Sequence, residues 1–574
     1  MAFRVRNISL ESILKICHIF FIRMCGIWFC TGPPQRRAEE CMTALHKRGP
    51  EAARSLQIKG VGTLGFTRLA INGLDPAGMQ PMRKEDLSWV CNGEIYNWRE
   101  LAVEYGIQTV SGSDCEVLGE LYEIFCRRGI PLDGFFRALD GVFALIIVDE
   151  GRQQIIVARD PYGVRPLYSG IARNGQMAFA SEMKALTPIC AGIEAFPPGH
   201  FLRIDLASSE DSNTNPYHSI PFLKNPVYTV IPQMAGMAVV AALEGAVKKR
   251  MMTERPVAAL LSGGVDSSLI AALVAKELRA ARAPPLRTFS IGMKGSTDLL
   301  YAKMVAEHIG SQHTEVVLTA DDFFAAVPEV IRTIESYDTT TVRASVGNWL
   351  VAKAVAEQSD CKVLFNGDGA DEIWGSYLYF YGAPSDHAFE EETHRLLTDI
   401  HMFDVLRSDR SISSHGLEPR TPYLDKQFVA TAMSIPTEMR RPVRGGRCEK
   451  WLMRKAFEES GILPIEVLWR RKEAFSDGVS GTEKSWYEIA QEKAEALLGP
   501  EWRKNGANGL EPAKTAEQQY YRDCFVKEYG AEHMLVNVPY FWMPKWTKGV
   551  TDPSARALAE YKSVANLCHP SGEA

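Results

Sequence analysis

The sequence lacks any apolar run close to the ~18 to 20 residues that a membrane span needs. It also lacks a C-x-x-C pair, and its twelve cysteines are scattered over 574 residues, so neither a disulfide framework nor a structural zinc site is indicated. Basic charge is not in excess, because the net charge is −6. We therefore expect a soluble, cytosolic enzyme that acts on small molecules, with no nucleic acid or membrane partner.

What is present is an ordinary globular composition, with 46% hydrophobic and 23% charged residues, in a chain long enough for several cores. Residues 25–207 alternate short β-rich runs with turns and a few helical segments, which is typical of a layered α/β domain. Residues 208–233 are rich in Ser, Asn, Asp and Pro and are expected to form a linker. A second domain is expected over 234–550, a tail over 551–574 and an extension over 1–24.

The second domain shows strands alternating with helices. Strands are predicted at 257–261, 288–291, 314–318 and 362–365, and this alternation favours a parallel sheet. Ligands of such sheets bind at the carboxyl ends of the strands. The segments 262–268 and 366–372 both follow predicted strands, so we expect them to form one site.

The first of these segments, Ser-Gly-Gly-Val-Asp-Ser-Ser, reads as a pyrophosphate-binding loop. Gly263 and Gly264 allow the backbone to approach an anion, while Ser267 and Ser268 are expected to cap the following helix and direct its N–H groups at phosphate. Asp266 would repel phosphate unless it holds a bridging Mg²⁺. No Lys follows the glycines, unlike in the G-x-x-x-x-G-K-[ST] loop. The pattern resembles that of the ATP pyrophosphatases, which cleave ATP between the α- and β-phosphates.

Cys25 opens a second set of motifs. The segments 24–27, 48–50, 65–71, 92–97, 112–114 and 160–167, in this order, resemble the glutaminase domain of class II glutamine amidotransferases, which has the N-terminal-nucleophile (αββα) fold. In that family the Cys is the first residue of the mature chain. Its α-amine, with an ordinary pKa of about 7.7 to 8, can accept the thiol proton. One departure is Lys47-Arg48-Gly49-Pro50-Glu51, where the family usually has His-Arg-Gly-Pro-Asp.

The resemblance implies roles in glutamine hydrolysis. The side chain of Asn92 and the backbone N–H of Gly93 would form the oxyanion hole. Arg68 would bind the α-carboxylate of glutamine, and Asp114, together with the backbone around Glu94, its α-ammonium group.

The two domains together resemble the glutamine-hydrolysing asparagine synthetases, from Met24 almost to the end of the chain. The second half matches at 336–345, 367–372, 415–418 and 469–478. The resemblance implies a doubly wound parallel-sheet domain of ATP pyrophosphatase type. It also implies that aspartate is converted to asparagine through β-aspartyl-AMP, with glutamine as nitrogen donor and with release of glutamate, AMP and pyrophosphate. Glutamine, aspartate and ATP would be the bound molecules, and a homodimer is one expectation for the assembly.

The resemblance also implies roles in the second domain. ATP would be bound by Leu261, Ser262, Gly263, Gly264, Asp266, Ser267, Ser268, Ile291, Asn366 and Gly367, with Mg²⁺ between Asp266 and Asp371. Lys472 would stabilise the pentacoordinate transition state, while Thr340, Thr341 and Arg343 would orient aspartate. Asp368 would take the proton from ammonium, although it is one methylene shorter than the Glu that the family usually has.

Four alternatives stay open. An amidophosphoribosyltransferase would need a phosphoribosyl-pyrophosphate loop in place of the segment at Ser262, and a β-lactam-forming synthetase would usually lack the nucleophile. A non-catalytic relative would be favoured by loss of Cys25, Asp266 or Lys472, all of which are present. An ammonia-only synthetase is the fourth, because residues 1–23 would abolish the free α-amine. We expect translation to begin at Met24 or the extension to be absent from the working protein; an organelle-targeting segment is the other interpretation.

Overall fold

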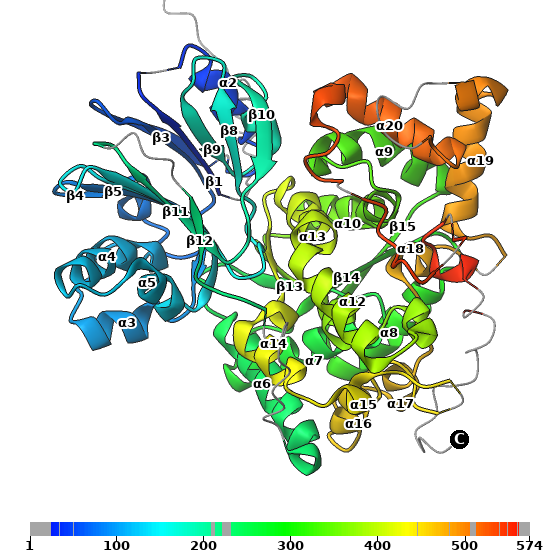
Figure 1. The fold of residues 1–574 in the computed structure, drawn as a ribbon. Helices are drawn as coiled ribbons and strands as arrows, with labels where there is room; N and C mark the ends of the chain where they lie inside the picture. Colours follow the sequence, from blue (N-terminus) through cyan, green and yellow to red (C-terminus); the bar gives the residue numbers. More distant parts are fainter. Residues whose placement is uncertain are drawn as a thin grey trace, which may run out of the picture.

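The computed structural model of the protein describes residues 25–561, except 34, 50, 208–212, 221–230, 445, 482, 505–511, 539, 548, 551 and 559–560. The predicted extension, parts of the predicted linker and most of the predicted tail lie outside the described residues. Within the described residues no helix combines the length and the apolar character that a bilayer span requires. Figure 1 shows two domains side by side, with the blue to cyan strands on the left and the green to red helices on the right.

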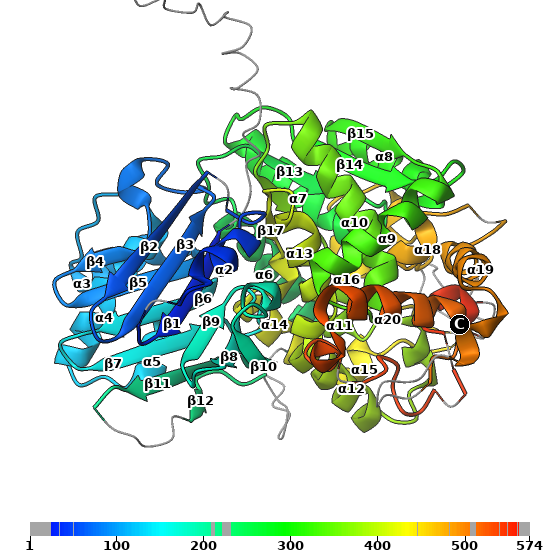
Figure 2. The same ribbon diagram turned by 90° about the horizontal axis from the view of Figure 1, so that it is seen from above.

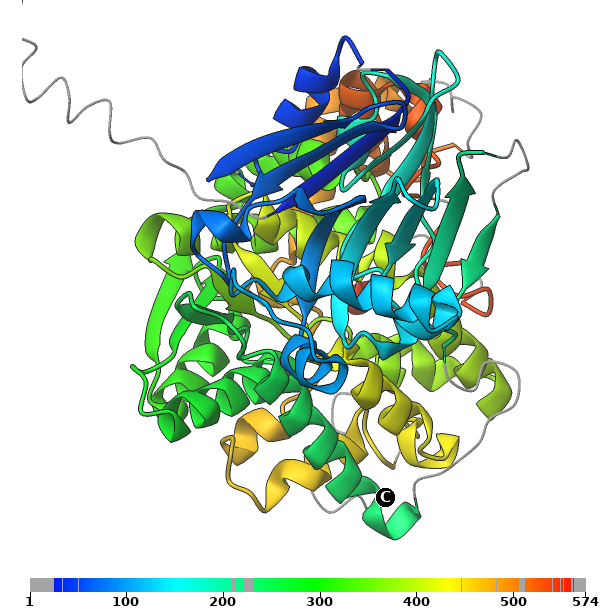
Figure 3. The ribbon, with the colours of Figure 1, turned by 90° about the vertical axis from the view of Figure 1, so that its left-hand side faces the viewer.

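The first domain contains two antiparallel six-stranded sheets. One has the order β10 (Cys190–Ala195), β8 (Tyr168–Ala172), β9 (Met177–Ala180), β1 (Gly26–Thr31), β3 (Gly62–Arg68), β2 (Ala52–Ile58). The other has the order β12 (Thr214–Pro216), β11 (His200–Asp205), β7 (Gln154–Arg159), β6 (Gly141–Asp149), β5 (Leu87–Ile95), β4 (Met82–Lys84). Figure 3 looks onto this domain and shows the two layers of strands one above the other.

Alternation along the strands builds the layers of this domain. Ile27 and Phe29 of β1 pack between the sheets against alternate residues of β6, Ala144, Ile146 and Val148. The intervening residues of β6 face outward to α3 (Trp98–Tyr105), α4 (Val117–Arg127) and α5 (Leu132–Ala138). The short helix α2 (Ala38–Ala44) lies against β3 of the other sheet. The result is the αββα layering predicted from the resemblance.

The second domain is built on a parallel sheet of order β15 (Gln312–Val317), β14 (Arg287–Gly292), β13 (Val257–Leu260), β16 (Val363–Phe365), β17 (Glu418–Arg420). The central strands β13 and β16 are buried on both faces, since Val363 and Phe365 face one apolar cluster and Leu364 faces another. This explains why these two strands read as continuous apolar runs, whereas the edge strand β15 is partly exposed and partly polar. The four predicted strands are confirmed with shifts of one or two residues, whereas β17 was not predicted.

Helices cover both faces of this sheet (Figure 2). One cluster includes residues of α6 (Ala235–Lys249), α7 (Val265–Ala280), α14 (Lys426–Met433) and α16 (Trp451–Glu458). The other includes residues of α9 (Ala320–Ile334), α10 (Thr339–Gln358), α13 (Asp404–Ser413), α19 (Trp486–Leu498) and α20 (Ala516–Tyr529). The remaining helices are α8 (Thr297–Ile309), α11 (Ala370–Trp374), α12 (Asp386–Asp399), α15 (Thr437–Arg440), α17 (Ile465–Leu468) and α18 (Phe475–Gly478).

The domains share two apolar clusters. Leu69 and Tyr162 of the first domain belong to the same cluster as residues of α6 and α7. Trp28, Leu45 and Tyr168 of the first domain belong to the same buried cluster as residues of α9 and α10. Within the expected linker, β12 pairs with β11, and Tyr217 is buried and donates to the carbonyl oxygen of Arg159 at 2.7 Å. Residues 213–217 therefore pack as part of the first domain.

Candidate active sites

A cavity lies at the carboxyl ends of β13, β14 and β16. The chain passes from β13 to β14 on one side and later to β16 on the other, so the connections diverge and leave a crevice between β13 and β16. Most of the predicted residues line this cavity: Leu261, Ser262, Gly264, Asp266, Ser267, Ile291, Thr340, Asn366, Gly367, Asp368, Asp371 and Lys472. The structure thus brings together segments that are far apart in sequence.

The loop from Ser262 to Ser268 has the backbone that its glycines predict. Gly263 has φ +72° and lies so close to α8 that an added Cβ would be 2.5 Å from the N of Ala302. The expectation that Ser267 and Ser268 cap α7 is wrong, because the capping position is Gly264 and no side chain caps it. Instead Ser267 Oγ accepts a hydrogen bond from Ser262 N at 3.1 Å and closes the loop. The first N–H groups of α7 remain available to an anion in the cavity.

Two carboxylates that line this cavity pair with two lysines, of which Lys472 lines the cavity and Lys450 is buried behind it. Lys450 Nζ donates to both Asp266 and Asp371, and Lys472 Nζ lies 2.5 Å from Asp371 and 3.9 Å from Asp266. Burial opposes ionisation, but the two ammonium groups hold the pKa of Asp371 below its ordinary value, and the two carboxylates raise the pKa of Lys472. Asp266 Oδ1 is buried without a hydrogen-bond partner.

Lys450 was missed by sequence reasoning. It has φ +57° immediately before α16, and no motif or spacing connects it with the aspartates. Only the tertiary fold reveals it.

Asp368 lies among further charged groups that the sequence analysis did not assign. Its Oδ1 accepts from Arg407 Nη2 at 3.0 Å, and burial raises its pKa although Arg407 opposes this. The hydroxyl of Tyr377 lies 2.6 Å from Glu372 Oε1 and 3.0 Å from Asp404 Oδ2. All five side chains line the cavity.

Four predicted residues lie elsewhere. Gly263 packs on α8 and Ser268 is fully buried in α7. Thr341 donates through Oγ1 to Asp338 Oδ2 at 2.8 Å, at the start of α10. Arg343 is buried and forms ion pairs with Glu517 and Asp552.

Cys25 immediately precedes β1 in the first domain. Its thiol lies between the backbone groups of Leu69, accepting from the N–H at 3.3 Å and donating to the carbonyl at 3.2 Å. Burial raises the pKa of this thiol to about 12; the charge of Glu94 adds to the effect and that of Arg68 opposes it. A thiol with this pKa stays protonated at neutral pH, so a thiolate forms only with a base that takes the proton.

The proposed oxyanion residues lie side by side on β5. Gly93 is so close to β6 that a Cβ would be 2.0 Å from the carbonyl oxygen of Val142, which requires glycine here. Asn92 is buried, and its amide donates to Ser181 Oγ with a long contact of 3.4 Å. A weakly held amide can turn to a better acceptor.

The predicted glutamine-binding residues surround the same strand. Arg68 ends β3 and donates to the carbonyl of Gly73. Asp114 accepts from Ile95 N at 2.7 Å, and burial raises its pKa to about 6. Glu94 accepts from Asn72 Nδ2 at 2.6 Å and lies 3.4 Å from Arg420 Nη2, a group of the second domain.

Two known protein families match the two domains of this chain. The glutamine amidotransferase domain family matches residues 24–235, and the asparagine synthase family matches residues 238–390 and 383–536. The chain therefore joins a glutamine amidotransferase domain to a synthetase domain. Among solved structures, the glutamine phosphoribosylpyrophosphate amidotransferase of B. subtilis matches at 16% identity with a TM-score of 0.30, over 52% of this chain and 91% of that chain, which is too weak to bear on the assignment.

Full-length relatives narrow this class. Proteins named asparagine synthetase [glutamine-hydrolyzing] are 40% identical in Gallus gallus and 41% identical in Homo sapiens, each aligned over 94% of this chain and 100% of the relative. The chain belongs to the glutamine-hydrolysing asparagine synthetase family.

Proposed function

We propose that the protein converts aspartate to asparagine at the expense of ATP, with glutamine as nitrogen donor. The observation that carries this proposal is the presence of two sets of polar groups in one chain, the buried Cys25 thiol within reach of the charges of Glu94 and Arg68, and Lys472 beside Asp371 in the second-domain cavity. Glutamate, AMP and pyrophosphate would be the further products. The ammonia set free at Cys25 would pass within the protein to the second site.

In the glutaminase domain the proposed step is attack of the Cys25 sulfur on the side-chain carbonyl carbon of glutamine. The carbonyl oxygen becomes an oxyanion, and Gly93 N and Asn92 Nδ2 are the donors that would stabilise it. The raised pKa of the buried thiol means that a base must take its proton first. A free α-amine of Cys25 would supply that base.

In the synthetase domain the β-carboxylate of aspartate would attack the α-phosphorus of ATP and displace pyrophosphate. Lys472 would stabilise the added negative charge, and the N-terminus of α7 would bind the pyrophosphate. Thr340 lines the cavity and stays the predicted aspartate contact. Asp368, already paired with Arg407, would take the proton from ammonium before ammonia attacks the adenylate.

Mg²⁺ fits the residues present. Mg²⁺ is usually bound by one or two carboxylates together with phosphate oxygens, and Asp266 and Asp371 are two carboxylates in one cavity. Asp266 Oδ1 has no hydrogen-bond partner and is available to a cation. Asp266 and Asp371 would hold the ion, and the ion would supply positive charge to the pyrophosphate.

Product analysis tests the proposal. Aspartate-dependent turnover should give AMP and pyrophosphate in equal amounts, whereas ADP and phosphate would contradict the assignment.

Asp266→Ala should abolish synthesis and leave glutamine hydrolysis, because Asp266 belongs to the other domain. Cys25→Ala should abolish glutamine-dependent synthesis and leave synthesis from ammonium salts, which reach the second site from solvent. Equal loss of both activities in folded variants would contradict the two-site proposal.

A second candidate function is ammonia-dependent synthesis alone, which applies where residues 1–23 remain attached and Cys25 has no free amine. Two further proposals concern the cellular location and the oligomeric state of the protein. We place the protein in the cytosol, since its cysteines lack the pattern of a disulfide framework, and fractionation tests this. The predicted homodimer is tested by sedimentation.

A further inference from the structure

Helix α13 lies between the two active sites. All of its residues except Asp404 are buried, including the charged side chains of Arg407, Asp409 and Arg410. Buried charges are tolerated when ion pairs and hydrogen bonds compensate them. The partners of these side chains therefore show what the helix holds in place.

Two of these charged side chains project from opposite faces of α13. Arg407 donates to Asp368 in the synthetase cavity at 3.0 Å. Asp409 follows two residues later, which in an α-helix is a turn of about 200° around the axis. It faces the glutaminase domain, where its two oxygens accept from Nη1 and Nη2 of Arg48 at 2.6 and 3.1 Å.

Arg48 connects this carboxylate with the nucleophile. It is fully buried, and its Nε donates to the backbone carbonyl of Cys25 at 2.9 Å. Its Nη1 also donates to Ser413 of α13 and to Glu182, each at 3.0 Å. Burial alone would lower the pKa of Arg48, but the charges of Asp409 and Glu182 raise it.

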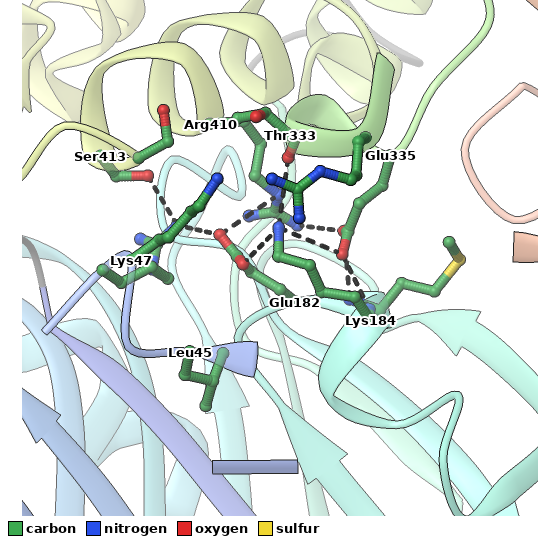
Figure 4. A network of polar contacts seen from close by, with 12 residues as sticks. Leu45, Lys47, Glu182, Lys184, Thr333, Glu335, Arg410 and Ser413 are labelled. Atoms are coloured by element: carbon green, nitrogen blue, oxygen red, sulfur yellow. Dashed lines mark hydrogen bonds and ion pairs between the residues drawn. The ribbon is translucent and has the colours of Figure 1, made fainter. Parts of the chain in front are cut away.

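Glu182 accepts one hydrogen bond from Arg48 and also pairs with Lys184 and Arg410. Asp409, by contrast, binds both terminal nitrogens of the Arg48 guanidinium. Figure 4 shows Glu182 and Glu335 facing Arg410 and Lys184 where the two domains meet. Asp409 itself also lies 3.3 Å from Arg410 and 3.7 Å from Arg165. Its bidentate contact is the one that fixes the plane of the Arg48 guanidinium, and hence the direction of Nε.

We propose that Asp409, a residue of the synthetase domain, is a positioning residue for glutamine hydrolysis: through Arg48 it fixes the backbone of Cys25 beneath the thiol. The glutaminase site is thus incomplete without α13. This inference rests on the proposed role of Cys25 as the glutaminase nucleophile.

Asp409→Asn tests it, because the amide keeps the shape and removes the charge. The variant is prepared in the same form as wild-type protein that hydrolyses glutamine. Its kcat for glutamine hydrolysis should be about tenfold or more below that of the wild type, as expected for loss of a charge-assisted hydrogen bond. KM for glutamine should change by less than about twofold, because a positioning group acts on the reacting geometry rather than on substrate binding. Ammonia-dependent synthesis by the same variant should stay within about twofold of the wild type.

Comparing glutamine hydrolysis with ammonia-dependent synthesis in the same variant distinguishes a positioning role of Asp409 from a purely structural one. A residue that merely holds α13 would lower ammonia-dependent synthesis as well, since α13 carries Arg407, and equal losses would overturn the proposal. Unchanged glutamine hydrolysis would overturn it too. Asp425→Asn is the matched control: Asp425 is equally buried and pairs with Arg250 at 2.7 Å, and its loss should leave glutamine hydrolysis unchanged.

Ser413→Ala keeps the test decisive if Asp409→Asn does not fold. It removes one neutral acceptor of Arg48 and should give a smaller loss of the same kind, about threefold in hydrolysis with synthesis from ammonia unchanged. No loss in Ser413→Ala, with Asp409→Asn unfolded, would also count against the proposal. Failure of the underlying function is recognised separately, because Cys25→Ala would then still hydrolyse glutamine.

Discussion

Lys472 and Lys450 contact the same two aspartates, yet we expect their replacements to act on different quantities. Lys472 is 12% exposed in its side chain and lines the cavity, whereas the side chain of Lys450 is fully buried. Lys472 can therefore reach a substrate in the cavity. Lys450 is placed to neutralise Asp266 and Asp371 before any ligand arrives.

Lys472→Gln should lower kcat of ammonia-dependent synthesis by about 10²- to 10³-fold, the loss typical of one preorganised electrostatic donor, which is about 3 to 4 kcal/mol of transition-state stabilisation. KM for ATP should change by much less, because the added charge at phosphorus exists only in the transition state. Asp371 keeps Lys450 as a partner, so the melting temperature should move little.

The assay is release of pyrophosphate with aspartate and ammonium as substrates, with glutamine hydrolysis measured in parallel as a control for folding. Lys450→Gln is the matched variant. It removes the partner that Asp266 and Asp371 share, and should lower the melting temperature and raise KM for ATP. A Lys472→Gln enzyme with normal kcat and only a raised KM for ATP would refute the transition-state role.

Three further outcomes are expected. Arg343→Leu should destabilise the fold by about 3 to 5 kcal/mol, because it leaves the buried Glu517 without its cationic partner; a raised KM for aspartate with unchanged stability in urea would instead support the predicted substrate contact. Asp425 has a pKa lowered to about 2 in the folded protein despite its burial, through Arg250 and Lys249, so its charge stabilises the fold above the unfolded pKa of about 3.9, and this stabilisation is lost as the pH falls toward 2. Urea unfolding of Asp425→Asn should therefore show a deficit of about 2 kcal/mol at pH 7 that narrows below about pH 4, and a deficit independent of pH would contradict this. Protein that retains residues 1–23 should lack glutamine hydrolysis, while protein beginning at Cys25 should have it, and intact mass measured beside the assay decides the point.

Much of the architecture could be predicted because local pattern and tertiary fold agree. The apolar runs before Ser262 and Asn366 form buried parallel strands, and Gly263 adopts the left-handed φ that only glycine adopts without strain. Cys25 immediately precedes β1, and Asn92 lies within β5. Their placement follows once the sheets form.

What could not be predicted depends on contacts between distant segments. Lys450 meets the aspartates through a loop with no periodic pattern, and the three residues of β17 give too short a run to read as a strand. Arg343 carries a charge that fits a substrate equally well, but its partners Glu517 and Asp552 come from the far end of the chain. Sequence shows that a charge is present, and only the fold shows which group neutralises it.

Strand β17 has a consequence for dissection of the protein. It is the edge of the parallel sheet, and its neighbour on the open side is the glutaminase domain, which pairs Arg165 with Glu418 and Glu94 with Arg420. Pro419 removes one hydrogen-bond donor from the edge but leaves its acceptors. A fragment beginning at residue 234 would expose this edge and leave Arg420 and Glu418 paired only with each other. It should therefore self-associate through strand pairing rather than behave as an independent synthetase.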